Sequence, residues 1–276
     1  MPFWDAKPKA LWKSQKKRMT AGQFAKLVKA NGFDMSPLFA IPGFNMLMVC
    51  IDVLHAVDLG VAQEIVGNVF YEALGTFAAG RNKALQVANL QLKLKAHYKR
   101  MKTANRIGEL TPEMLKKDGK APKLRAKGGE TRHVVPFALE IAIAMHASMD
   151  TDHSLNVLTC LSGLMDFYMC LGIRPFPIDC AKDAGRRVSL TYQHLNEEAK
   201  ARDMQRWAVK PKHHIFMELI EFQLDELGDP MSYWCYKDED HVGKIAHLGE
   251  SRGGRGSATL TAARVIKHIR GLPSVC

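Results

Sequence analysis

Hydrophobic residues recur along most of this chain at intervals of three and four, the spacing of an amphipathic helix. Between residues 52 and 76, for example, Leu54, Val57 and Val61 fall on one face. Residues 44–51 carry the one run that resembles a strand. The sequence therefore predicts a mainly α fold, a helical bundle with little or no sheet. The predicted helices span residues 20–32, 52–76, 85–102, 135–148, 154–171, 178–206, 213–227, 236–249 and 257–270.

Prolines and glycines interrupt this helical pattern. Residues 36–43 are predicted to be irregular, because proline fixes φ and cannot donate a backbone hydrogen bond. Residues 105–132 are rich in Lys, Gly and Pro and predict a flexible basic insertion. Inside it, Thr111 followed by proline predicts the N-cap of one short helix. We expect two regions, a basic N-terminal arm at 1–35 and a single helical region at 36–276.

Positive charge is concentrated in two stretches. The chain has 39 Lys+Arg against 28 Asp+Glu, a formal net charge of +11. Residues 1–30 hold eight Lys/Arg and one acid, and residues 81–132 hold fifteen Lys/Arg and four acids. Such clustering is typical either of a solvated surface or of a polyanion binder, because neutralised phosphates release counterions. With Tyr98 the one aromatic among the central lysines, contact with the DNA backbone is favoured over base stacking. The expected contacts are Lys93, Lys95, Lys99, Arg100, Lys102, Arg252 and Arg255.

Several functional classes are not predicted. No apolar run approaches the roughly 18 residues of a membrane span, and the basic N-terminus lacks the apolar core of a secretion signal. The six cysteines form no C-x-x-C pair, as expected for reduced thiols in an intracellular protein. The glycine-rich turn at 253–256 lacks the P-loop pattern, and no serine or cysteine lies in a nucleophile elbow. Neither nucleotide binding nor triad hydrolysis is therefore expected.

Three segments carry side chains that suit either a metal ion or a helix end. Asp52 and His55 lie three residues apart on a predicted helix, so they can share one ligand site, or Asp52 can cap the helix. His213 and His214 begin another helix, with an acid one turn beyond the second histidine. The acids at 238–240 suit either Mg²⁺ or the positive end of a helix dipole.

Taken in this order, the segments resemble a CACTA-type DNA transposase over about residues 38–261. Residues 52–55 resemble its D-x-x-H motif, and residues 67–69 the asparagine-valine helix that follows. Residues 210–214 resemble its proline-histidine stretch, and residues 234–239 its W-x-Y-x-x-E block. The resemblance implies an RNase H-like fold with an all-helical insertion. The chain would correspond to the insertion and the last catalytic helix.

The same resemblance implies functional roles for particular residues. Enzymes of this family hold two Mg²⁺ ions with a D-D-E set of carboxylates, and the ions clamp the attacking and leaving oxygens of a phosphodiester. By position, Glu239 is the third catalytic carboxylate. Asp52 and His55 belong to the D-x-x-H element, and His213 or His214 to the histidine element. The implied partner is DNA, and the implied location is the nucleus.

The chain departs from the family at the other catalytic positions. No aspartate before Asp52 lies in a comparable context, the usual cysteine pair is absent, and Glu218 stands where a second histidine is expected. One carboxylate cannot assemble a two-metal site. We therefore expect a transposase-derived fragment, or a domesticated remnant, that binds DNA. It is catalytically incomplete on its own unless a second transposase chain supplies the missing aspartates.

Two other classes fit the same residues. A helical interaction or scaffold protein with no nucleic-acid role predicts basic residues scattered over several faces. A zinc-stabilised helical domain, with His55, His213 or His214 and an acid around Zn²⁺, predicts stoichiometric zinc in the purified protein.

The missing carboxylates predict that this chain alone does not cleave DNA. In a single-turnover nicking assay with Mg²⁺ or Mn²⁺, we expect no product above the level without protein, because two metal ions have too few ligands. Robust cleavage that Glu239→Gln abolishes would contradict this prediction.

Overall fold

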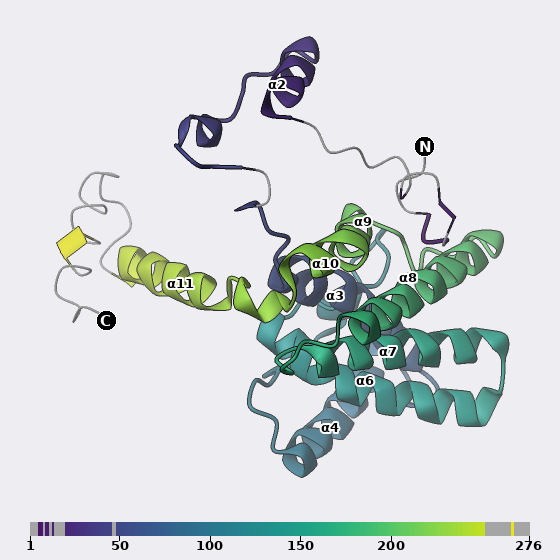
Figure 1. Cartoon of the computed structure of the whole chain (residues 1–276). Helices are drawn as coiled ribbons and strands as arrows, with labels where there is room; N and C mark the ends of the chain where they lie inside the picture. Colours follow the sequence, from purple (N-terminus) through teal and green to yellow (C-terminus); the bar gives the residue numbers. More distant parts are fainter. Residues whose placement is uncertain are drawn as a thin grey trace. The chain divides into compact units, whose positions relative to one another are not determined.

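The computed structural model describes residues 5–7, 9, 10, 13, 20–45, 48–251, 266 and 267. Within them the chain is mainly helical and contains no strand or sheet, so the predicted α fold is confirmed (Figure 1). The described part of residues 44–51 is not a strand, and a single isolated bridge joins Leu74 to Ala78. The chain forms two compact units, Met1–Tyr233 and Trp234–Cys276.

The helices largely follow the predicted ranges. The predicted helix at 257–270 lies outside the described residues except for 266 and 267, which are helical. The second unit contains α11 (Tyr236–Ser251). The first unit contains α2 (Ala21–Ala30), the 3₁₀ helix η1 (Pro37–Ala40), the π-helix η3 (Leu54–Val61), α3 (Ala62–Ala73), α4 (Lys83–Met101), α5 (Pro112–Leu115), α6 (Gly128–Met149), α7 (Asp152–Cys170), α8 (Ile178–Ala201), α9 (Pro211–Glu218), the π-helix η4 (Leu219–Gln223), α10 (Leu224–Leu227) and the 3₁₀ helix η5 (Pro230–Ser232).

Local capping explains why several helix starts were predictable. Thr20 accepts the N–H of Gln23, whose side chain reaches back to the Thr20 N–H in a capping box. Thr111 caps α5 ahead of its proline, as predicted, whereas Asn82 caps α4 at Lys83, before the predicted start at residue 85. These bonds depend only on residues within one turn, so the sequence carries the whole signal.

The helix predicted over residues 52–76 is instead two helices joined at a bend. Gly60 has φ −123° and ψ −107°, outside the helical region, and it ends the regular part of η3 before α3 begins. A Cβ at position 60 would lie 2.9 Å from Cδ of Lys212 and 3.1 Å from the carbonyl oxygen of His55. The bend therefore leaves room for α9, whose Lys212 Nζ donates to the Leu59 carbonyl at 2.8 Å.

The core of the first unit lies around α3. Helices α6, α7 and α8 pack on one another in sequence order, and α3 packs against α6 and α7 (Figure 1). Every residue from Ala62 to Phe70 is buried, so α3 contacts protein on all sides. Edge-to-face aromatic pairs fill the layers beside it, with ring centroids 5.8 Å apart for Phe70 and Phe137 and 5.6 Å apart for Phe167 and Phe216.

One face of α3 is polar although it is buried. Glu64, Asn68 and Glu72 lie at successive four-residue intervals along it. Lys210 Nζ contacts both Glu64 carboxylate oxygens, at 2.7 and 2.8 Å. The Trp207 backbone N–H donates to Asn68 Oδ1 at 3.0 Å, and its indole N–H donates to Glu72 Oε1 at 2.7 Å. These bonds supply the partners that buried carboxylates and amides require.

His153 extends the polar face to two more helices. Its Nε2 lies 3.0 Å from Glu72 Oε2 and its Nδ1 lies 2.7 Å from Glu198 Oε2, so the ring joins α3, α7 and α8. The hydrogen bond to Glu72 is the main cause that raises the pKa of His153 to about 9; burial opposes it, and Glu198 adds to it. With a carboxylate at each nitrogen, the ring is a doubly protonated imidazolium at neutral pH.

The segment predicted as a flexible insertion is packed against α3. Leu110, Leu115 and Leu124 are buried in the core, and the Leu124 N–H donates to the Gln63 carbonyl at 2.8 Å. A Cβ at Gly67 of α3 would lie 2.4 Å from the backbone of this segment. The expectation was based on the Lys, Gly and Pro content, whereas the three leucines determine where the segment lies.

The described part of the basic arm also contacts the helices. The Ala6 N–H donates to Gln193 Oε1 at 2.8 Å, and Lys13 Nζ lies 2.6 Å from Glu221 Oε1. Both contacts lie within the first unit, and the boundary between the two units falls after Tyr233.

The close approach at Gly67 predicts a large effect of one added methyl group. Gly67→Ala forces the backbone of the 105–127 segment away from α3, and we expect a loss of about 1–3 kcal/mol in the free energy of unfolding. Gly22→Ala is the matched control, because a Cβ at that helical position meets nothing within 4 Å. We expect it to be neutral or stabilising by up to about 1 kcal/mol. Urea unfolding measures both, and equal effects of the two substitutions would contradict the packing described.

Candidate nucleic-acid interface

The C-terminal half of α4 and the turn after it form a hollow of about 430 Å³. Its lining is rich in cationic side chains that the structure leaves exposed. We call Lys95, Lys99, Lys102 and Arg106 the basic hollow. The complete lining is Lys95, Tyr98, Lys99, Lys102, Arg106, Ile107 and Gly108.

Helical periodicity and one turn bring these cations together. Lys95, Lys99 and Lys102 are spaced by four and three residues, so they share one face of α4. Lys102 has φ 50° and ends the helix in the left-handed region, and the chain then turns back. Arg106 Nε donates to the Thr103 carbonyl at 2.7 Å. Tyr98, buried beneath the lysines, accepts the Ile107 N–H on its hydroxyl at 3.2 Å and holds the turn.

The positive charge of the basic hollow is not neutralised from within the part of the chain that the structure describes. No carboxylate there lies within 4.0 Å of a charged nitrogen of Lys95, Lys99, Lys102 or Arg106. The hollow therefore carries a local excess of positive charge, and an anion is the complementary ligand.

Two cations that the sequence assigned to the same surface have other partners. Lys93 Nζ lies over the Phe77 ring, 4.6 Å from its centroid. Arg100 lies 2.5 Å from Glu140 of α6. These residues are seven apart and share the α4 face that looks toward α6, whereas the basic hollow occupies another face. Arg252 and Arg255 lie outside the described residues.

Arg106 is a member of the basic hollow that the sequence analysis did not select. The helical spacing alone places Lys95, Lys99 and Lys102 on one face of α4 and Lys93 on another, so this distinction could be predicted from the sequence. No comparable signal marks Arg106, because it follows the end of the helix and its position depends on the turn.

A second, more open hollow of about 660 Å³ lies nearby. Glu130 lines it, and the negative charge of Glu130, after burial, helps to raise the pKa of Tyr98 beneath the basic hollow. This hollow is less positive, because Lys123 lies 3.6 Å from Glu64 and Glu130 is part of the lining. Its lining comprises Gln63, Lys123, Arg125, Ala126, Lys127 and Glu130.

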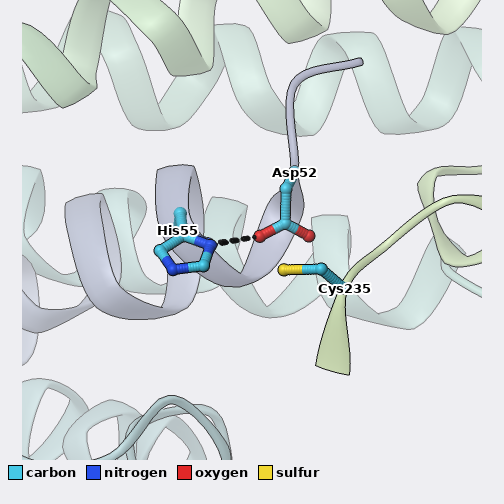
Figure 2. A group of neighbouring side chains, drawn as sticks. All are labelled: Asp52, His55 and Cys235. Carbon is cyan, nitrogen blue, oxygen red and sulfur yellow. Dashed lines mark hydrogen bonds and ion pairs between the residues drawn. The ribbon is translucent and has the colours of Figure 1, made fainter. Parts of the chain in front are cut away.

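Asp52 and His55 are brought together, in the geometry of a helix cap. The Asp52 carbonyl accepts the Ala56 N–H at 2.9 Å, and its Oδ2 accepts the His55 N–H at 2.9 Å. The same Oδ2 lies 2.7 Å from His55 Nδ1, as Figure 2 shows. An N-cap makes these two backbone bonds in this way, so the local structure accounts for the aspartate without a metal ion. Cys235, drawn in the same figure, belongs to the second unit.

His213 is enclosed in the first unit. Its ring centroid lies 4.2 Å from that of Tyr192. Burial is the main cause that lowers its pKa to about 4, and the nearby charges of Lys210 and Lys123 act in the same direction. Its buried Nε2 has no hydrogen-bond partner among the described residues. His213 is therefore a neutral core histidine at neutral pH.

His214 lies beside Glu218 of the same helix, with Nε2 and Oε1 3.6 Å apart. Among the residues that the structure describes, neither His213 nor His214 has its ligand atoms within 4.8 Å of two other potential metal ligands. Since a structural zinc ion needs about four ligands, these two histidines do not fit a zinc site. They also do not form one cluster with Asp52 and His55.

Glu239 belongs to the second unit, in the first turn of α11 beside Asp238. Its backbone N–H donates to the Cys235 carbonyl at 2.9 Å. Asp240, the next acid, lies 2.6 Å from Lys244 one turn further along the helix. Carboxylates at this end of a helix interact favourably with its dipole, which accounts for the three consecutive acids.

Comparisons with known proteins return no relative. No protein-family model, curated protein or solved structure matches the chain. No helix among the described residues is long and apolar enough to cross a bilayer. The transposase resemblance therefore depends on the three sequence segments around Asp52, His213 and Glu239.

The cap geometry predicts that Asp52 contributes to stability without a metal ion. Asp52→Ala should lower the free energy of unfolding by about 1 kcal/mol, while Asp52→Asn should retain most of it, because asparagine also caps helices. Asn82→Ala at the start of α4 is the matched control and should cost a similar amount. Urea unfolding with and without EDTA tests this. If EDTA removes the difference between wild type and Asp52→Ala, the carboxylate binds a metal ion instead.

Proposed function

We propose that this chain binds the phosphate backbone of DNA through the basic hollow. The observation that carries the proposal is the convergence of Lys95, Lys99, Lys102 and Arg106 on one hollow without an acidic partner among the described residues. The alternative hypothesis, a scaffold protein with no nucleic-acid role, predicts that the cations are scattered over several faces and paired with acids. Arg100, which is paired with Glu140, behaves in that way, whereas the cations of the basic hollow do not.

The chemistry of the hollow favours phosphate contacts over base recognition. Its one aromatic residue, Tyr98, is 3% exposed, and its hydroxyl is bound to the Ile107 N–H, so its ring cannot stack on a base. Lysine and arginine contacts to phosphate give affinity and register on the duplex but carry no sequence information. Binding should therefore depend strongly on salt and weakly on DNA sequence.

The proposed origin is a CACTA-type transposase, of which this chain is a fragment or a domesticated remnant that binds DNA. Support comes from the order of the three resembling segments. The Asp52 carboxylate accepts two hydrogen bonds from His55. The location that goes with this proposal is the nucleus.

The proposal is tested by removing four charges at once. Lys95→Gln, Lys99→Gln, Lys102→Gln and Arg106→Gln together should reduce the magnitude of the negative slope of log K against log salt concentration by roughly 3–4, since each phosphate contact contributes about −0.9. Fluorescence anisotropy with a duplex of random sequence, at salt concentrations from about 50 to 200 mM, measures this slope.

The double variant Lys93→Gln/Arg100→Gln is the matched control on the same helix. Its two charges are engaged with Phe77 and Glu140, so we expect a much smaller change in the slope. If the quadruple variant keeps the affinity and the salt slope of the wild type while remaining folded by circular dichroism, the basic hollow is only a solvated surface.

A further inference from the structure

Three cations from three separate segments surround the ring of Tyr71, a half-buried residue near the end of α3. Lys83 Nζ, at the start of α4, lies 4.8 Å from the ring centroid. Lys116 Nζ, just after α5, lies 4.9 Å from it. Arg206 Cζ, in the connection between α8 and α9, lies 5.2 Å from it. We call these four residues the Tyr71 cluster.

The arrangement concentrates like charges. Because all three cations lie near one centroid, no two can be more than roughly 10 Å apart, which is comparable to the Debye length of about 8 Å at physiological salt. Glu72 lies 3.6 Å from Arg206, but its carboxylate also binds the Trp207 indole and His153. Among the described residues, one carboxylate that also has two other partners does not neutralise the three positive charges of the cluster.

Attraction between a cation and an aromatic ring does not account for the arrangement. A single lysine over a single ring is the ordinary case, and Lys93 over Phe77 is an example in this same protein. Second and third cations at one ring add mutual repulsion. An anion at the site would replace that repulsion by attraction.

We propose that the Tyr71 cluster binds a phosphate group. A tetrahedral phosphate can serve all the donors present, because each of its four oxygens can accept more than one hydrogen bond; the planar Arg206 guanidinium can bind two oxygens and each lysine ammonium one. The phenol hydroxyl adds a further donor. This inference does not rest on the proposed DNA binding, because the Tyr71 cluster and the basic hollow share no residue.

The phenol of Tyr71 provides a spectroscopic signature of the site. Burial acts to raise its pKa, but the charges of Lys83, Lys116 and Arg206 and a hydrogen bond with Lys116 outweigh burial, so the pKa lies below its ordinary value. The pKa values of Tyr98, Tyr192 and Tyr233 are raised instead. Tyr71 should therefore ionise before these three tyrosines, and an anion bound at the cluster should raise its pKa.

The experiment follows tyrosinate absorbance in the full chain during an alkaline titration. Inorganic phosphate is compared with sodium chloride at equal ionic strength, and the step that Tyr71→Phe removes is assigned to Tyr71. We expect phosphate to raise the midpoint of that step by about one pH unit relative to chloride, because it neutralises the nearby cations. Lys83→Gln/Lys116→Gln should abolish the phosphate effect, whereas the matched control Lys93→Gln should keep it.

A second arm distinguishes free phosphate from phosphate carried on a nucleic acid. A short oligonucleotide replaces inorganic phosphate, and an effect of the oligonucleotide alone assigns the site to a strand phosphate. If neither anion moves the midpoint more than chloride does, the proposal is overturned. The quadruple variant of the basic hollow should keep the response of Tyr71, so failure of the DNA-binding proposal and failure of this inference give different results.

Discussion

The buried polar face of α3 is the constraint on which the first unit depends. Glu64, Asn68 and Glu72 lie inside the core, where an unpaired carboxylate would be strongly unfavourable. Their partners come from the connection that includes Trp207 and Lys210, far away in the sequence. That connection must therefore lie against α3, and it delivers Arg206 to the ring of Tyr71 as it does so.

Several acids of the first unit are buried and paired with cations, whereas the cations of the basic hollow are exposed and lie on another part of the unit. Buried acids take cationic partners inside the first unit, as Glu64 does with Lys210 and Asp58 does with Arg132 at 3.9 Å. Acids used in the core do not neutralise cations elsewhere. The lysines of the basic hollow have no acidic partner among the described residues, and this leaves an excess of positive charge there.

The helices were largely predictable and the sites only in part, for one physical reason. Capping by Thr111 and the periodicity of α4 involve residues a few positions apart, so the sequence shows them directly. The bend at Gly60 and the position of Arg106 depend on packing and on a turn. The Tyr71 cluster combines residues from four segments that are separated in the sequence, so no local sequence pattern predicts it. Asp52 and His55 were correctly paired, because i and i+3 on a helix must meet.

The imidazolium of His153 makes a proton part of the folded structure. Its pKa is about 9 when it lies between Glu72 and Glu198, while an unfolded histidine titrates near its ordinary value of 6.5. Between these two pH values the folded chain holds a proton that the unfolded chain does not, so folding takes up a proton from the buffer. This contribution to stability is complete below pH 6.5 and is lost as the pH rises through 9. The heat of unfolding therefore includes the ionisation enthalpy of whichever buffer accepts the released proton.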